Sequence, residues 1–311
     1  MSTVSHKIKY FTPETISEAI ELSVNNKDAS FISGGTDVMA NKQLGLLESR
    51  SLIDLGNIEE LKGMKVHGEY YTIGAAVVLS DIIANTYIVN NFKIIADAAK
   101  SVASPLIRNQ ATIGGNILCE NRCIYYNQSE LWREAAGYCL KCGGNICIAT
   151  GGKKTCLSKF VSDIAPALIC LNAKVILVSK GKEDIIPVAD LYSGGGLASK
   201  KFNNHILKSI LLPINIQHKS TFKKLRQRKT LEFTSLTMAV SAYDDGMIII
   251  ALSGVAPNPV VLLTHTNETI DNIYNELNKK SKIINNDFFD RKYRQTILKT
   301  YLSDSLSELK S

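Results

Sequence analysis

Short apolar runs alternate with amphipathic segments along the first third of the chain. Residues 52–55 and 70–75 are compact or alternating apolar runs typical of strands. Residues 16–24 instead place apolar side chains every three or four positions, as a helix does, and residues 79–86 and 92–102 show shorter helical patterns. The mixture predicts an α+β fold, because these segments are too short for a doubly wound parallel sheet.

The expected boundaries of several elements follow from local signals. A hydroxyl, a proline and a glutamate at residues 12–14 predict the start of the first helix. Farther along, residues 206–213 and 220–225 have the pattern of strands in a hairpin-like region, and residues 237–243 suit either a helix or a strand.

Two polar-faced helices are expected at the end of the chain, at about residues 268–280 and 291–309. A new α+β pattern begins after about residue 215. We therefore expect a first domain over residues 1–215 and a smaller α+β domain over residues 216–311.

A pair of glycines interrupts the pattern after the first expected helix. The segment reads Phe31-Ile32-Ser33-Gly34-Gly35-Thr36-Asp37-Val38. Its apolar lead-in predicts a buried strand end, and its glycines permit positive φ and close approach of a ligand to the backbone. Consecutive N–H groups and the Thr36 hydroxyl would suit phosphate oxygens. Gly and Asp are common in all tight turns, so this turn alone does not establish a cofactor site.

Two further segments carry polar groups at close spacing. The first reads Ile107-Arg108-Asn109-Gln110-Ala111-Thr112-Ile113-Gly114-Gly115-Asn116, a second glycine pair among hydrogen-bonding side chains. The second reads Ser162-Asp163-Ile164-Ala165-Pro166-Ala167-Leu168 and marks the return of regular structure after a cysteine-rich region.

Charge and hydropathy exclude several classes of partner. The net charge of +7 is spread along the chain, and its densest basic cluster, residues 223–229, has no interleaved aromatic residues, which favours a solvated face over nucleic-acid binding. The sequence contains no apolar run of about 18 residues, so no membrane span is expected. Residues 1–10 contain no apolar region typical of a secretory signal, so we expect a cytoplasmic protein whose cysteines are reduced.

Six of the seven cysteines lie between residues 119 and 156. Cys123, Cys139, Cys147 and Cys156 have the spacing C-x15-C-x7-C-x8-C. Four thiolates can hold a [4Fe–4S] cluster, one iron to each, or a tetrahedral zinc ion. Spacing alone leaves both open, together with unmetallated thiols.

The other three cysteines are weaker candidates. Cys142 forms a C-x2-C pair with Cys139 and is the main rival ligand, and Cys119 lies four residues before Cys123. Cys170 lies in an apolar run and is expected to be a buried thiol.

Taken in order, these motifs resemble the FAD-binding medium subunit of the molybdenum hydroxylase family, which includes xanthine dehydrogenase and the aerobic carbon monoxide dehydrogenases. The resemblance rests on the two glycine segments, residues 162–168, Ile73-Gly74-Ala75, and Gly254-Val255-Ala256-Pro257-Asn258-Pro259. It implies a two-subdomain FAD-binding domain of the PCMH/vanillyl-alcohol-oxidase type, followed by the smaller α+β domain.

An insertion at about residues 119–158 separates the second glycine segment from Ser162. It is similar to the insertion in the flavin subunit of 4-hydroxybenzoyl-CoA reductase, which carries an extra [4Fe–4S] cluster. The resemblance implies that Cys123, Cys139, Cys147 and Cys156 hold the cluster and that Cys142 does not.

The resemblance also implies a set of FAD-binding residues. The pyrophosphate would be wrapped by the residues Ser30, Phe31, Ile32, Ser33, Gly34, Gly35, Thr36 and Asp37. The opposing wall around the diphosphate and the flavin would be formed by Thr112, Gly114, Gly115 and Asn116. Asp163 would bond the ribityl or flavin region, Lys223 would lie near the isoalloxazine, and Val102 would line the adenine side.

The function implied by the resemblance is electron transfer, with no catalytic acid–base pair in this chain. Reduced ferredoxin or a similar donor would supply electrons, which would pass to a [2Fe–2S] small subunit and a molybdenum-cofactor large subunit that removes the phenolic hydroxyl of 4-hydroxybenzoyl-CoA. Two alternatives stay open: the medium subunit of a purine or N-heterocycle hydroxylase, and a non-redox scaffold stabilised by zinc.

Overall fold

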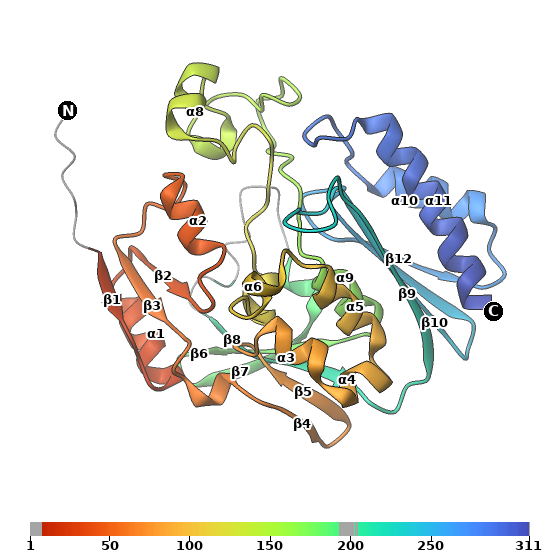
Figure 1. The fold of residues 1–311 in the computed structure, drawn as a ribbon, viewed down its shortest axis with the longest axis horizontal. Helices are drawn as coiled ribbons and strands as arrows, with labels where there is room; N and C mark the ends of the chain where they lie inside the picture. The colour runs from red at the N-terminus through yellow and green to blue at the C-terminus, as the bar shows by residue number, and fades with distance from the viewer. Residues whose placement is uncertain (1–7, 193–201, 203–204, 311) are drawn as a thin grey trace.

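Three β-sheets form the frame of the part of the chain that the structure describes (Figure 1). The computed structural model describes residues 8–192, 202 and 205–310, so the prediction about a secretory signal falls mostly on residues that are not described. A small parallel sheet has the order β1 (Lys9–Phe11), β3 (Ser51–Asp54), β2 (Ala29–Ile32).

The second sheet has five strands, and all its neighbours are antiparallel. Its order is β4 (Met64–His67), β5 (Tyr70–Gly74), β8 (Ile206–Pro213), β6 (Lys174–Ser179), β7 (Lys182–Pro187). The third sheet is antiparallel, with the order β12 (Val260–His265), β11 (Met247–Ser253), β10 (Leu236–Tyr243), β9 (His218–Leu225). The fold is therefore mixed, as the sequence predicted.

Helices cover the sheets and connect them. In the first two thirds of the chain they are α1 (Ile16–Asn25), α2 (Val38–Gln43), α3 (Leu79–Ala84), α4 (Thr86–Asn91), α5 (Lys93–Ser101), α6 (Pro105–Arg108), α7 (Ile113–Ile117), α8 (Glu130–Ala136) and α9 (Ile164–Cys170). The last two are α10 (Ile270–Lys280) and α11 (Arg291–Lys310). Short 3-10 turns are η1 (Glu59–Leu61), η2 (Leu140–Cys142) and η3 (Val188–Leu191).

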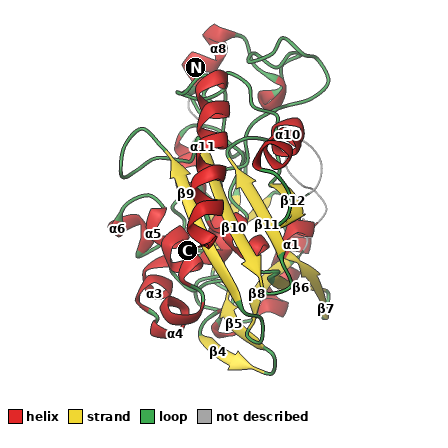
Figure 2. Cartoon of the chain, turned by 90° about the vertical axis from the view of Figure 1, so that its right-hand side faces the viewer, coloured by secondary structure: helices red, strands yellow, loops and turns green. Residues whose placement is uncertain are grey.

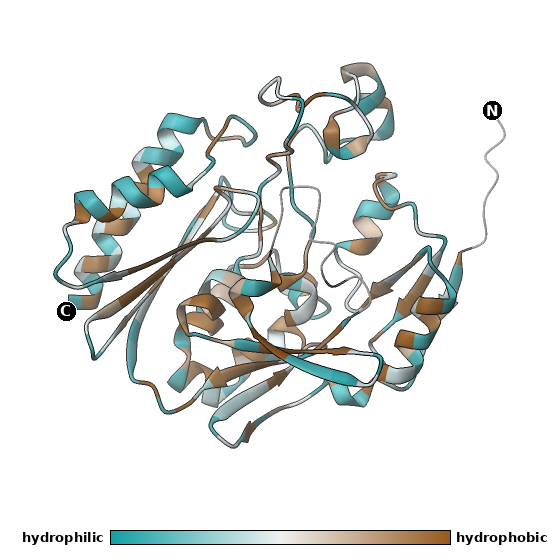
Figure 3. Ribbon diagram, turned by 180° about the vertical axis from the view of Figure 1, so that it is seen from behind, coloured by the Kyte–Doolittle hydropathy of each residue, from teal (hydrophilic) through white to brown (hydrophobic). Residues whose placement is uncertain are grey.

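The four-stranded sheet is buried on both faces. One face packs on α9 and α5 through residues such as Ala239 and Ile249. The other packs on α11, which lies across it in Figure 2, through residues such as Met238 and Leu302. In Figure 3, α10 and α11 are largely hydrophilic with apolar residues between, as expected for helices that bury one side.

Two local expectations need correction, and one open alternative is resolved. The cap of α1 is Thr15, whose hydroxyl accepts a hydrogen bond from the Glu18 N–H at 3.1 Å, and not Thr12. Residues 206–213 and 220–225 are strands, but they belong to different sheets and form no hairpin, because β8 pairs with β5 and β6 whereas β9 pairs with β10. Residues 237–243, for which both states were open, are a strand.

The last strand of the five-stranded sheet ends at Pro213, and the four-stranded sheet begins at His218. These ends lie on either side of the expected boundary near residue 215, which stays a prediction. No helix among the described residues is both long enough and apolar enough to cross a membrane.

Candidate functional site

The first glycine segment is the turn between β2 and α2. Gly35 has φ +70°, which explains the need for glycine at that position. Within the part of the chain that the structure describes, the N–H groups of Ser33, Gly34, Gly35 and Thr36 donate to no acceptor. Consecutive unpaired N–H groups in a turn favour an anion, so this segment suits the diphosphate of a dinucleotide.

Contacts with other segments of the chain hold both sides of this turn in place. A Cβ on Gly34 would come within 1.8 Å of the Gln110 carbonyl oxygen, so the two glycine segments touch at this point. On the N-terminal side, the Ser30 hydroxyl bonds the hydroxyl of Ser49, and Phe31 and Ile32 continue β2.

The second glycine segment differs from the first in its hydrogen bonding. Thr112 caps α7 by accepting from the Gly115 N–H at 3.2 Å, and the Gly114 N–H donates to the Ala75 carbonyl at 2.9 Å. The Asn116 N–H donates to the Thr112 carbonyl. Since these donors are satisfied within the chain, the segment forms a wall beside the first turn and does not form a second anion-binding turn.

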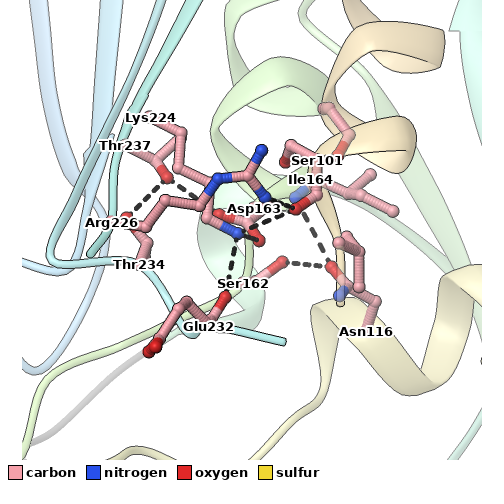
Figure 4. A network of polar contacts seen from close by, with 12 residues as sticks. Ser101, Asn116, Ser162, Asp163, Ile164, Lys224, Arg226, Glu232, Thr234 and Thr237 are labelled. Carbon is pink, nitrogen blue, oxygen red and sulfur yellow. Dashed lines mark hydrogen bonds and ion pairs between the residues drawn. The ribbon is translucent and has the colours of Figure 1, made fainter. Parts of the chain in front are cut away.

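Asn116 and Asp163 are brought close together by a polar network (Figure 4). The Asn116 Oδ1 accepts from the Ser162 hydroxyl at 2.8 Å. Asp163, which is 4% exposed at the start of α9, accepts from the Lys224 ammonium at 2.5 Å and from the Thr237 hydroxyl at 2.9 Å. Both carboxylate oxygens therefore have partners in the four-stranded sheet.

Lys223 does not join this network. Side chains alternate along β9, and Lys223 points to the α11 face, where its ammonium pairs with Glu308 at 2.6 Å. Lys224 occupies the opposite face and pairs with Asp163. The strand register, which the sequence did not reveal, therefore places Lys224 and not Lys223 beside Asp163, and the expected position of Lys223 near the isoalloxazine stays a prediction.

Val102 lies at the end of α5, beside a concentration of positive charge. Its carbonyl accepts from Arg108 at 2.7 Å, and the preceding Ser101 carbonyl accepts from Lys224 at 3.0 Å and Arg226 at 2.8 Å. Burial, and then the nearby Arg226, lower the pKa of Arg108. The carbonyl end of a helix favours cations, which explains why these three gather there.

The four predicted cysteine ligands converge on one cavity in the insertion. Cys123, Cys139, Cys147 and Cys156 all line it, although they come from separate segments of a largely irregular stretch. Burial raises the pKa of Cys123 to about 11, and neighbouring Cys139 and Cys156 also raise it. Four thiols around a shared cavity form a donor set suited to an iron–sulfur cluster.

The rival cysteines do not line this cavity. The Cys142 sulfur lies 3.5 Å from that of Cys139, and burial raises its pKa to about 11. Cys119 has a pKa raised to about 12, mainly by burial, and Cys170 is fully buried, where its thiol donates to the carbonyls of Ala239 and Ile249. Cys170 is the buried thiol that the sequence predicted.

Among residues 8–192, 202 and 205–310, no group of three or more His, Cys, Asp or Glu side chains is placed to hold a single metal ion. The convergence of the four cysteines is therefore a shared cavity lining and not a preformed metal group.

The sequence did not indicate two residues that form ion pairs with candidate site residues. Lys224 could have been found from its alternation with Phe222, which packs against the core. Arg122, one residue before Cys123, ion-pairs with Asp37 of the first turn while being only 8% exposed. Nothing in the sequence pattern indicated this contact across 85 residues.

Known proteins share both the sequence and the fold. A family model described as the FAD binding domain in molybdopterin dehydrogenase matches residues 6–215. The aldehyde oxidoreductase FAD-binding subunit PaoB of Escherichia coli K12 is 28% identical over 265 residues, 81% of this chain and 83% of that protein. The xanthine dehydrogenase FAD-binding subunit of Escherichia coli O157:H7 is 33% identical over 109 residues, 35% of this chain and 37% of that protein.

The fold has a counterpart among solved structures. A chain of the Cu,Mo-CO dehydrogenase in its cyanide-inactivated form superposes with a TM-score of 0.77 at 19% identity, covering 97% of each chain. This likeness, together with the family match, confirms the expected fold of an FAD-binding domain. The chain belongs to the family of FAD-binding domains found in molybdopterin dehydrogenases, the medium subunits of molybdenum hydroxylases.

Proposed function

We propose that this chain is the electron-transfer subunit of a molybdenum-containing oxidoreductase and holds both FAD and a [4Fe–4S] cluster. The observation that carries the proposal is the convergence of Cys123, Cys139, Cys147 and Cys156 on one cavity in a member of an FAD-binding family. When bound, such a cluster carries single electrons and FAD exchanges them singly or in pairs, so the two together suit a relay.

The residues proposed to bind FAD are those of the first turn and its surroundings. The free N–H groups of Ser33 to Thr36 would bond the diphosphate, with Ser30, Phe31, Ile32 and Asp37 shaping the turn. The segment Thr112 to Asn116 would form the neighbouring wall. Asp163 would bond the ribityl or flavin region, Val102 would line the adenine side, and Lys223 would lie near the isoalloxazine. Lys224, which pairs with Asp163, is a further candidate for a lysine beside the flavin.

An iron–sulfur cluster is proposed over zinc because the insertion resembles the one that carries a [4Fe–4S] cluster in the flavin subunit of 4-hydroxybenzoyl-CoA reductase. A cluster takes one thiolate at each of four irons, whereas zinc draws four ligands around a single centre at about 2.3 Å. Cys123, Cys139, Cys147 and Cys156 would supply one thiolate for each iron.

The partners and the substrate are part of the proposal. By family membership the chain would join a molybdenum-cofactor large subunit and a [2Fe–2S] small subunit, with ferredoxin or a similar protein as external donor. The cysteine-bearing insertion supports reduction of 4-hydroxybenzoyl-CoA or a related aromatic acyl-CoA. A second candidate, oxidation of an aldehyde, purine or N-heterocycle, is favoured by the names of the relatives.

Anaerobic purification of the chain tests the proposal. We expect one FAD and four irons per chain in the wild type, loss of most iron in Cys123→Ser, and near-normal iron in the matched control Cys142→Ser. A colourless chain with about one zinc and no flavin would contradict the electron-transfer function. Iron retained in Cys123→Ser but lost in Cys142→Ser would contradict the ligand assignment.

The substrate is tested with the complete complex. The acyl-CoA assignment would be supported if the complex reduces 4-hydroxybenzoyl-CoA with a low-potential donor and does not oxidise purines or aldehydes with an acceptor. The reverse result would support the second candidate and leave the cofactor assignment intact.

A further inference from the structure

Helix α2 is held at both ends by arginines of the cysteine-bearing insertion. It begins directly after the first glycine turn, at Val38, and ends at Gln43. In Figure 1 the lobe that contains α8 lies above α2, although the two are far apart in the sequence. Arg122 and Arg133 make the connections, and both are almost completely buried, with 8% and 2% exposed.

Arg122 contacts the beginning of α2. Its Nη2 forms an ion pair with Asp37, the last residue of the glycine turn, and its Nη1 donates to the Asn41 Oδ1 at 3.0 Å. The guanidinium also lies over the Phe233 ring, 4.4 Å from its centroid. The backbone of Arg122 is fixed by a two-way bridge with Lys159, and the next residue is Cys123.

Arg133 contacts the end of α2. Its Nη2 donates to the Leu44 carbonyl at 2.9 Å and lies 3.5 Å from the Gly45 carbonyl, which are groups that the helix leaves unpaired. The same guanidinium bonds the Gln128 carbonyl and pairs with Glu130, both in the insertion. Arg133 is therefore tied to both segments and lies between Cys123 and Cys139 in the sequence.

We infer that Arg122 and Arg133 are positioning residues that make the affinity of the glycine turn for FAD depend on the folded insertion. The inference rests on the proposed function. The N–H groups of the turn bind a diphosphate well only while α2 holds its place, and α2 is held by the insertion. Whatever fills the cysteine cavity fixes Cys123, and with it Arg122, so the two sites are coupled.

Coupling of this kind is reciprocal. If the filled cysteine cavity strengthens FAD binding, bound FAD must strengthen retention of iron by the same factor. Binding at one of two coupled sites usually changes the affinity of the other site by about five- to 150-fold. The effect would pass through Arg133 even though that residue touches neither the turn nor a cysteine in the contacts described.

The test measures FAD dissociation constants by flavin fluorescence in the iron-loaded chain and after removal of iron with a chelator. In the wild type we expect FAD to bind at least about fivefold more weakly after chelation. In Arg133→Ala we expect weak binding in both forms. Arg133→Lys, which keeps a donor for the Leu44 carbonyl, should recover most of the affinity. Arg228→Ala, which loses the ion pair between the 69% exposed Arg228 side chain and Glu232, should match the wild type.

Thermal denaturation separates positioning from general destabilisation. A merely structural role would lower the melting temperature of Arg133→Ala while leaving the FAD affinity of the folded chain unchanged, and that result would overturn the inference alone. Equal FAD affinity with and without iron in the wild type would do the same. A wild-type chain that binds neither FAD nor iron would overturn the proposed function and this inference together.

Discussion

Single glycines in this chain meet different physical demands although they look alike in the sequence. Gly35 supplies a positive φ in the first turn, whereas Gly34 permits contact with the Gln110 carbonyl. Gly114 likewise leaves no room for a side chain, since a Cβ there would lie 2.8 Å from the Ala75 carbonyl oxygen. The glycine pairs therefore serve packing of the two turns as much as access for a ligand.

Substitution of Gly34 should expose this packing role. In Gly34→Ala the new methyl group would overlap the Gln110 carbonyl, so we expect a loss of about 1–3 kcal/mol in the free energy of unfolding and weaker FAD binding. Urea denaturation and FAD titration measure the two effects. Gly152→Ala is the control, because a Cβ there meets only the rotatable Thr150 hydroxyl at 3.3 Å. Unchanged stability of Gly34→Ala would show that the turns do not touch.

At the level of the strand, the register of β9 explains why Lys223 and Lys224 have different partners. Strand β9 has one face toward α5 and α9 and the other toward α11. Lys224 is opposite Thr237 in the register with β10, and both contact Asp163. Lys223 is opposite Met238, which packs under α11.

The two lysines provide a matched pair of variants. Lys224→Met leaves the carboxylate of Asp163 buried without its ionic partner, so we expect a loss of about 3–5 kcal/mol in the free energy of unfolding. Lys223→Met removes a pair whose Glu308 side chain is 54% exposed and should cost no more than about 1 kcal/mol. Chemical denaturation at neutral pH compares them, and equal losses would contradict the assigned faces.

The sequence predicted elements better than it predicted contacts between them. Strands β3, β5, β8 and β9 and the two terminal helices were recognised from periodicity and lie within a few residues of their expected positions, whereas β1, β4, β7 and β12 were not predicted. The pairing of β8 and β9 was wrong, because a short connection such as residues 214–217 joins two sheets as readily as two strands of one sheet. Contacts such as that of Arg122 with Asp37 depend on tertiary packing, which periodicity does not encode.

The candidate site was predictable to different degrees. The four cysteine ligands were chosen by the resemblance, because their spacing alone left a cluster, zinc and unmetallated thiols open. That they share a cavity required the structure. The opposite roles of the two glycine segments also required it, since the free and satisfied N–H groups have the same sequence signature.

At the scale of the whole molecule, the insertion and the residue that follows it contact both α2 near the N-terminus and Asp287 in the C-terminal part of the chain. Arg122 and Arg133 tie it to α2, and Lys159 ties its base to the C-terminal region. The Lys159 ammonium pairs with Asp287, which also accepts from the Ser235 hydroxyl at 2.7 Å. This pair is buried, with side-chain exposures of 9% and 1%.

The Lys159–Asp287 pair should make stability depend on acid pH. Burial alone would raise the pKa of Asp287, but Lys159, Ser235 and Arg294 outweigh it and hold the pKa below the usual 3.8. A carboxyl group with a depressed pKa contributes its full stability above the unfolded value and loses it as the pH falls through the folded value.

We therefore expect Asp287→Asn to cost about 3–5 kcal/mol at pH 7, with the difference from the wild type shrinking below a pH of about 3.8. Urea denaturation of both proteins across this range measures the difference. A difference that stays constant with pH would show that the carboxylate charge does not stabilise the fold.

The wall of the cysteine cavity has a consequence for the order of events during synthesis. Ile284 and Asn286 form part of that wall, and the Asn286 side chain donates to the Leu157 carbonyl at 2.8 Å, across 129 residues. A chain emerging from the ribosome therefore presents all four cysteines long before the segment that encloses them exists. Under the proposed function, metal delivered to the nascent chain would meet a site that Ile284 and Asn286 do not yet cover.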